Sequence, residues 1–161
     1  MKKTNPLHTA CTMKVKFSHV NLISRNWRSL ADFYVAVFDC KPKPPERDLS
    51  GLWLNKLTGL NKSQIKGIHL LLPGYDSDGP TLEIFEYNQN IKNYKKNINV
   101  EGFGHIAFAV ENVEEKLKLL LKHGGSTVGE LIEADITGVG RISVVYARDP
   151  EGNIIEIQKW V

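Results

Sequence analysis

The hydrophobic positions of the chain change their spacing several times, and the same succession of spacings occurs twice. Apolar and polar residues alternate between residues 14 and 23, which is typical of a β-strand with one buried face. Residues 26–38 then carry the apolar stripe of an amphipathic helix, formed by Leu30, Phe33, Tyr34, Val37 and Phe38. The proline-rich run at 41–45 predicts the end of that helix, because proline cannot continue one.

Short apolar runs follow the first helix and predict further strands. They lie at residues 51–54, 65–73 and 81–87, and the turn-rich residues 73–80 join the last two as a hairpin. His69 lies among leucines in the second run, so we expect it to be a core or rim residue.

The succession of strand, helix and strands then begins again. Residues 104–110 predict a strand, and Asn112 with Glu115 three positions later predicts the start of a helix that ends at Gly124. Strands are predicted around residues 127–128, at 141–147 and at 153–160, with a tight turn at 149–153. The chain is therefore an internal repeat.

Each half of the repeat opens with a histidine in a strand and closes with a glutamate in a strand. These residues are His19 and Glu83 in the first half, and His105 and Glu156 in the second. Since side chains alternate across a strand, each of the four is expected on the face opposite an apolar row. Two halves paired about a pseudo-twofold axis would bring the four side chains together. Two imidazoles and two carboxylates without a thiolate favour a divalent ion such as Zn, Ni, Co, Mn or Fe(II).

Composition narrows the class of protein without indicating its chemistry. The chain has 161 residues, 42% of them hydrophobic and 24% charged, which predicts one soluble domain. Its two cysteines, Cys11 and Cys40, are expected to be unpaired thiols in a reducing compartment. The net charge of +3 does not indicate nucleic acid, and no apolar run approaches the roughly 18 residues of a membrane span. We therefore expect a cytoplasmic protein without nucleic-acid or membrane partners.

Several motifs of the chain resemble those of the vicinal oxygen chelate superfamily, which includes glyoxalase I, methylmalonyl-CoA epimerase, fosfomycin-resistance proteins and extradiol dioxygenases. The resemblance covers residues 14–161. It is carried by residues 18–22, 32–34, 81–87, 104–110 and, most specifically, Asp149-Pro150-Glu151-Gly152-Asn153 before the last strand.

The resemblance implies an α+β fold of two βαβββ modules that form a cupped, open, barrel-like mixed sheet with helices outside. The expected organisation is a tail at 1–13, a first module at 14–88, a linker at 89–100 and a second module at 101–161. The superfamily's ligand positions fall on His19, Glu83, His105 and Glu156, and the resemblance implies one divalent metal ion there.

The function that the resemblance implies is a glyoxalase I-like, metal-dependent lyase or isomerase. It would act on a small carbonyl substrate by proton transfer through an enediolate, with Glu156 as the base and Glu83 as the second carboxylate. Two alternatives remain open: an iron-dependent ring-cleaving dioxygenase, and a non-catalytic small-molecule binding or resistance protein.

The substrate is less well defined by the sequence. Glyoxalase I-like proteins commonly have a basic residue four positions after the first histidine, where this chain has Ile23 and, nearby, Arg25. A thiol-conjugated substrate therefore stays open. Residues 45–64 lengthen only the first module, so we expect a lid and pocket there, with Trp53 as the pocket aromatic. The superfamily also implies a homodimer, with modules paired within a chain or exchanged between two chains.

Overall fold

A computed structural model describes residues 15–92 and 96–161 of the chain. The predicted tail at 1–13, with Cys11, lies outside the described residues. Three helices are described: α1 (Trp27–Phe38), α2 (Leu52–Thr58) and α3 (Val113–Lys122). The strands are β1 (His19–Ile23), β2 (Lys41–Ser50), β3 (Gln64–Leu71), β4 (Thr81–Tyr87), β5 (Ile106–Ala109), β6 (Ser126–Thr127), β7 (Ile132–Ile136), β8 (Gly140–Arg148) and β9 (Ile154–Trp160).

The repeat seen in the sequence is also a repeat of topology. The first sheet has the order β1-β4-β3-β2, and the second has the order β5-β9-β8-β6, with β7 also paired to β8. In each sheet the first strand is parallel to the last strand of its module, and the remaining pairs are antiparallel. The predicted α+β fold of two βαβββ modules is confirmed, and neither sheet closes into a barrel.

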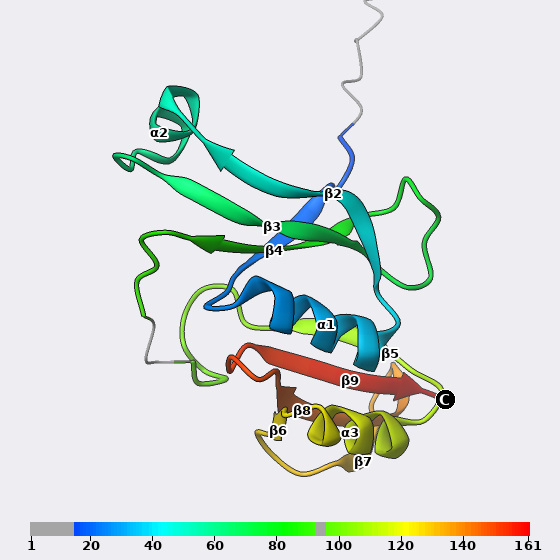
Figure 1. The fold of residues 1–161 in the computed structure, drawn as a ribbon. Helices are drawn as coiled ribbons and strands as arrows, with labels where there is room; N and C mark the ends of the chain where they lie inside the picture. Colours follow the sequence, from blue (N-terminus) through cyan, green and yellow to red (C-terminus); the bar gives the residue numbers. More distant parts are fainter. Residues whose placement is uncertain (1–14, 93–95) are drawn as a thin grey trace, which may run out of the picture.

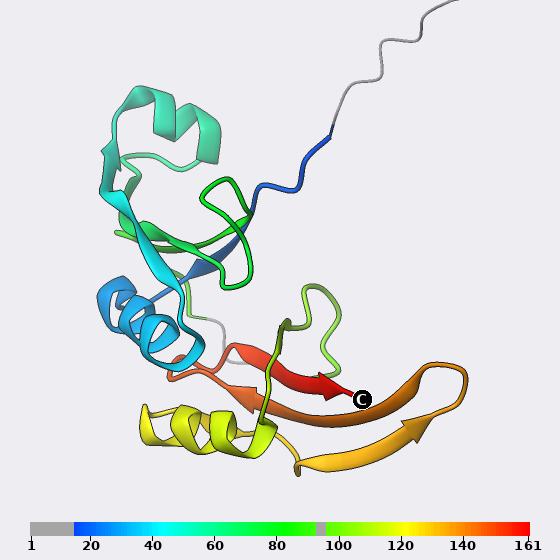
Figure 2. The same cartoon turned by 90° about the vertical axis from the view of Figure 1, so that its right-hand side faces the viewer.

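Helix α1 begins and ends where the sequence predicts. The Asn26 side chain accepts a hydrogen bond from the Ser29 amide, and Asp39 takes the left-handed conformation at the other end. Asn112 caps α3 in the same way, through the Glu115 amide. Figure 1 shows α1 between the first sheet and β9, and Figure 2 shows α1 and α3 on the same side of the molecule.

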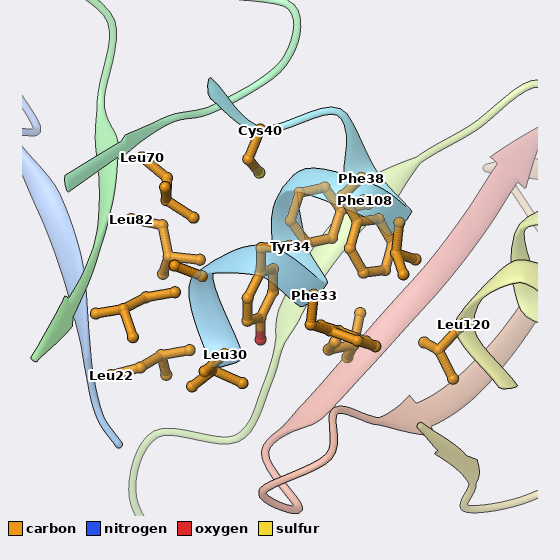
Figure 3. Close-up of a cluster of buried hydrophobic side chains, with 14 of the residues drawn as sticks. Leu22, Leu30, Phe33, Tyr34, Phe38, Cys40, Leu70, Leu82, Phe108 and Leu120 are labelled. Atoms are coloured by element: carbon orange, nitrogen blue, oxygen red, sulfur yellow. The ribbon is translucent and has the colours of Figure 1, made fainter. Parts of the chain in front are cut away.

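The hydrophobic core joins the two modules through α1. The ring of Phe38 stacks on Phe108 of β5, with centroids 4.1 Å apart and planes 14° apart (Figure 3). Leu82 and Ile84 of β4 are fully buried against the same helix, whose own Tyr34 is also fully buried. The apolar faces of both sheets therefore share one core, and the polar face of each sheet lies on the side away from that core.

Three elements differ from the sequence prediction. Strand β2 includes the proline run at 41–45; it lies at the edge of its sheet and has a register shift between Lys43 and Arg47, and edges and bulges are the places where a sheet tolerates proline. The apolar run at 51–54 belongs to α2 rather than to a strand, between Gly51 and the left-handed Gly59. Strand β7 was not predicted, because its side chains are mostly exposed and the segment has little apolar contrast.

None of the three described helices is long and apolar enough to cross a membrane.

Candidate metal centre

The polar face of the first sheet carries a row of side chains that crosses all four strands. Strand register places Asn21 beside Glu83, Glu83 beside His69, and His69 beside Lys43. Because registered neighbours share a face of a sheet, these four side chains lie opposite the core residues Leu82 and Ile84.

The first predicted pair, His19 and Glu83, is brought together on this face. Nε2 of His19 lies 3.4 Å from Oε2 of Glu83, and the Asn21 amide donates a hydrogen bond of 3.2 Å to the same oxygen. The Glu83 side chain is only 11% exposed, whereas that of His19 is 44% exposed. The carboxylate is thus fixed at the bottom of the face, with the imidazole above it.

The second predicted pair, His105 and Glu156, has matching geometry in the second sheet. Nε2 of His105 lies 3.2 Å from Oε2 of Glu156, and the two side chains are 33% and 14% exposed. Tyr146 is the cross-strand neighbour of Glu156, and a hydrogen bond to that carboxylate, together with partial burial, raises the pKa of the phenol. The position that Tyr146 fills in the second module is filled by His69 in the first.

The spacing within each pair fits two ligands of one metal ion. Donors that each lie about 2.1 Å from an ion at a tetrahedral angle are separated by about 3.4 Å. Imidazole and carboxylate are ligands that borderline divalent ions accept. Each module therefore presents one imidazole–carboxylate pair at this spacing.

The two pairs do not meet within the single chain. His19 lines a cavity of about 460 Å³ together with residues of β2 and β3, whereas His105 lines a different cavity of about 270 Å³. Among residues 15–92 and 96–161, no three His, Cys, Asp or Glu side chains form a group suited to hold a metal. The predicted ligands thus occur as two separate pairs.

His69, expected to be a core or rim residue, lines the cavity of His19 and contacts Glu83. Its Nε2 lies 2.9 Å from Oε1 of Glu83, and its Nδ1 lies 3.1 Å from Oγ1 of Thr81. Burial lowers the pKa of His69, the Glu83 carboxylate opposes this, and the nearby charge of Arg47 lowers it further. His69 is thereby a second imidazole on Glu83, held on the side away from Asn21.

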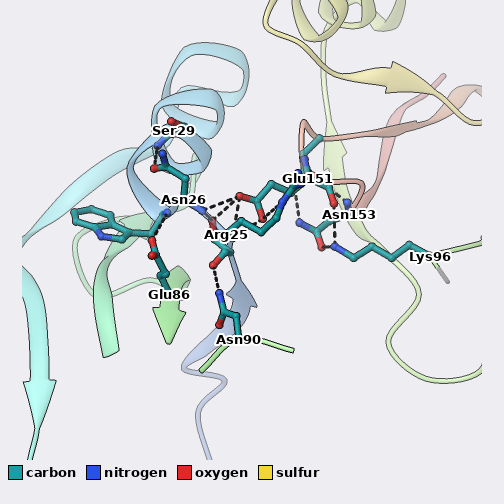
Figure 4. A network of polar contacts seen from close by, with 11 residues as sticks. Arg25, Asn26, Ser29, Glu86, Asn90, Lys96, Glu151 and Asn153 are labelled. Atoms are coloured by element: carbon teal, nitrogen blue, oxygen red, sulfur yellow. Dashed lines mark hydrogen bonds and ion pairs between the residues drawn. The ribbon is translucent and has the colours of Figure 1, made fainter. Parts of the chain in front are cut away.

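The Asp149–Asn153 turn does more than precede the last strand. Oε1 and Oε2 of Glu151 accept hydrogen bonds from the amides of Arg25 and Asn26, at the start of α1 (Figure 4). The Ser24 hydroxyl donates to Oε1 over 2.8 Å, and the guanidinium of Arg25 lies 3.9 Å from Oε2. Glu151 of the second module therefore binds the segment that leads into α1 of the first module. We call these contacts of Glu151 with Ser24, Arg25 and Asn26 the Glu151 clamp.

A buried carboxylate supports this turn from below. Asp149 accepts hydrogen bonds from the Tyr34 hydroxyl, the Glu151 amide, and the amide and side chain of Asn153. Despite these bonds, burial raises the pKa of Asp149 above its ordinary value. The Asp149–Asn153 motif thus connects the second module to the first, through Asp149 to Tyr34 and through Glu151 to the start of α1.

The segment expected to form a lid contributes little to the described cavities. Trp53 lies on α2 and is 53% exposed. Of residues 45–64, Arg47 lines the His19 cavity, and Trp53 does not line it.

Comparisons with known proteins agree with the fold. The family profile described as the Glyoxalase/Bleomycin resistance protein/Dioxygenase superfamily matches residues 16–157. No curated protein sequence matches the chain. Among solved structures, a glyoxalase family protein from Bacillus cereus is 18% identical with a TM-score of 0.70, over 96% of this chain and 99% of that one.

Two further structures have the same fold at similar identity. A glyoxylase/bleomycin resistance protein/dioxygenase domain from Frankia sp. is 18% identical with a TM-score of 0.59, over 92% of this chain and 99% of that one. The fosfomycin resistance protein FosX of Listeria monocytogenes, solved with Mn(II) and sulfate, is 18% identical with a TM-score of 0.54, over 92% and 95%.

Proposed function

Because the chain belongs to the Glyoxalase/Bleomycin resistance protein/Dioxygenase superfamily, we propose that it is a metal-dependent lyase or isomerase of the glyoxalase type. The observation that carries the proposal is the pair of matching His–Glu contacts, His19 with Glu83 and His105 with Glu156, at equivalent places of the repeat. The presence of Mn(II) in FosX supports the choice of a divalent ion.

The four donors divide the work at this site between holding the ion and moving a proton. A bound divalent ion would polarise a substrate carbonyl and stabilise the negative charge that develops on its oxygen. Glu83 has three polar neighbours in the chain, Asn21, His19 and His69, and these hold its carboxylate in one orientation.

Glu156 is the better group to move a proton. His105 is its ion-pair neighbour and Tyr146 its hydrogen-bond donor, so the carboxylate has fewer fixed partners than Glu83. A carboxylate placed beside the substrate carbon removes a proton from the position next to the carbonyl and returns it elsewhere. Glu156 is therefore the proposed base, and Glu83 the second carboxylate of the proton shuttle.

The complete site is proposed to form between two chains of a homodimer. Each chain supplies one pair from its first module and one from its second, and these pairs line different cavities in the single chain. A C2 dimer places the first module of one chain against the second module of its partner twice, which gives two equivalent four-ligand sites.

Elemental analysis of the chain purified without chelator tests the proposal. We expect about one Zn, Ni, Co, Mn or Fe per chain, and a loss of that metal in both His19→Ala and His105→Ala. His123→Ala is the matched control, because His123 is an exposed imidazole at the end of α3. The proposal fails if the native chain holds no stoichiometric metal and takes up none of the five ions.

A further inference from the structure

The cavity that His19 lines has a strongly positive wall. It has a volume of about 460 Å³, and its lining includes Lys16, Lys43 and Arg47 but only one acidic residue, Asp78. A volume of this size is in the range of small-molecule sites, which usually have a few convergent polar groups. The floor of the cavity is the polar face with His19, His69 and Thr81, so the positive wall adjoins the first His–Glu pair.

An irregularity of β2 brings two of these cations, Lys43 and Arg47, closer together along the sheet. Lys43 pairs with His69 across the strands, but the register shifts between Lys43 and Arg47, and Arg47 pairs with Gly67. Such a bulge re-aims side chains at a sheet edge. Lys43 and Arg47 are four residues apart and share a face of the strand, and the bulge brings Arg47 to within two positions of His69 along β3. Both cations line the cavity above His69.

None of the three cations is neutralised by a carboxylate among the described residues. Lys16 donates to the carbonyl of Asp78, Lys43 to the carbonyl of Ser77, and Arg47 to the carbonyl of Pro45. In contrast, two other cations of the same module, Arg28 and Lys66, form ion pairs with Glu46 and Asp48. Carbonyl oxygens orient the cavity cations and leave their charge available to an anion.

The charge of this wall reaches the floor of the cavity. Lys43 is the cross-strand neighbour of His69, and Arg47 lies opposite Gly67, two positions from His69 on the same strand, with all three side chains lining one cavity. Both cations are therefore close enough to act on a group bound over the imidazole.

The cavity of the second pair is different. Its lining combines Lys96 with the acidic Glu101 and the apolar Leu22, Val100 and Phe103. The two halves of the proposed site are thus alike in their ligands and unlike in their surroundings. This difference gives the substrate an orientation.

We propose that the cavity above His69 binds the anionic group of the substrate, a carboxylate or a phosphate, through Lys43 and Arg47. The inference rests on the proposed function for the identity of the ligand as substrate, and on the cavity alone for the binding of an anion. With the anion held in the first module, the reacting carbon would be directed toward the Glu156 side of the site.

Anion titration of the full chain tests the inference. Inorganic phosphate and acetate are titrated separately by calorimetry at constant ionic strength, so that general screening does not change. We expect saturable binding of at least one anion, and the preferred one identifies the substrate's group. In Lys43→Gln/Arg47→Gln, the affinity for that anion should fall about tenfold or more, since charge-assisted hydrogen bonds are lost.

The matched control is Lys56→Gln/Lys122→Gln, which removes the same charge from two exposed helix positions away from the cavity. The control should bind the anion with unchanged affinity. Equal weakening in both double variants, or no saturable binding of either anion by the native chain, overturns the inference. If the native chain holds stoichiometric metal but binds neither anion, only this inference is overturned. If it binds an anion but holds no metal, only the proposed function is overturned.

Discussion

At the scale of single residues, the two glutamates of the repeat are equivalent in sequence and different in surroundings. Glu83 has an imidazole, His69, as its cross-strand neighbour, and Glu156 has a phenol, Tyr146. The second imidazole holds Glu83 in one orientation, which suits its proposed roles as a ligand and as the second carboxylate of the proton shuttle, with Glu156 as the base. The phenol leaves Glu156 with a neutral donor, which suits a group that changes its protonation state.

Replacing His69 tests the idea that it positions Glu83. His69→Ala removes the contact of 2.9 Å to Oε1 of Glu83, so the carboxylate loses one of its orienting partners. We expect the metal affinity to fall about 10- to 100-fold, as for other groups that orient a ligand. Competition with a chromophoric chelator measures it, and His123→Ala serves as the control. An unchanged affinity in His69→Ala would show that Glu83 needs no such support.

The buried thiol of Cys40 gives a prediction with a defined pH dependence. Burial, and then the charge of Asp39, raises the pKa of Cys40 to about 12 from 9.0. In a Cys11→Ser background, native Cys40 should therefore react with a thiol reagent at pH 8 about a thousandfold more slowly than the unfolded chain.

The same shift links Cys40 to stability. The contribution of the protonated thiol is fully present below the unfolded pKa near 9 and is lost as the pH rises from there toward 12. Urea titrations of the Cys11→Ser chain and of Cys11→Ser/Cys40→Ala should therefore show a difference in unfolding free energy that decreases above pH 9. A constant difference across that window would contradict the assignment.

The position of His69 could not be predicted from the sequence, although its strand could. The run at 65–73 and the hairpin were predicted, but pairing Glu83 with His69 requires the register across a loop of nine residues, 72–80. A shift of one residue would have moved His69 to the apolar face. In contrast, His19, Glu83, His105 and Glu156 were identified because the arrangement of a strand histidine followed by a strand glutamate occurs once in each half of the repeat.

At the scale of elements, helix α1 is held at its start by the second module. The backbone amides of Arg25 and Asn26, which directly precede its first residue Trp27, donate hydrogen bonds to Glu151, at a separation in sequence of 125 to 126 residues. A carboxylate at this end also interacts favourably with the helix dipole. The motif containing Glu151 predicted a tight turn, but its long-range partner has no local signal, because capping by a distant side chain leaves no pattern near the helix.

Glu151→Gln tests the strength of the Glu151 clamp. The amide keeps the shape of the side chain, but it removes the negative charge and one acceptor oxygen from the helix start. We expect the free energy of unfolding to fall by about 1–3 kcal/mol, measured by urea denaturation. Glu130→Gln, at an exposed position, should leave the stability unchanged. Equal stability of the two variants would show that the clamp contributes nothing.

At the scale of the whole molecule, the open question is how the two modules of the repeat pair to complete the proposed site. The fold of two modules follows from hydrophobic spacing and motifs, which act locally. The placement of one module against the other follows from the Phe38–Phe108 stack and the Glu151 clamp, and neither was predicted. Because these contacts between the modules were not predicted, the sequence could not decide whether the modules pair within one chain or between two chains.

Mixing two inactive variants distinguishes these two pairings. If each site joins the first module of one chain to the second module of its partner, a dimer of His19→Ala with His105→Ala retains one intact site. Refolding equal amounts together should restore about a quarter of the native metal content, since half of the dimers are mixed and each has one site. Light scattering checks that the mixture is dimeric. If the sites form within single chains, mixing restores no metal.

The proline-rich strand β2 also limits how the chains of this protein can associate. Strand edges with free N–H groups invite further strands, and such growth leads to aggregation. Pro42, Pro44 and Pro45 lack these donors and lie on the outer strand of the first sheet. That border is therefore closed to sheet extension. The opposite border, β1, has no proline and begins at His19. The border at β1, where the proposed ligand His19 lies, is therefore the border of this sheet that prolines leave open to a second chain.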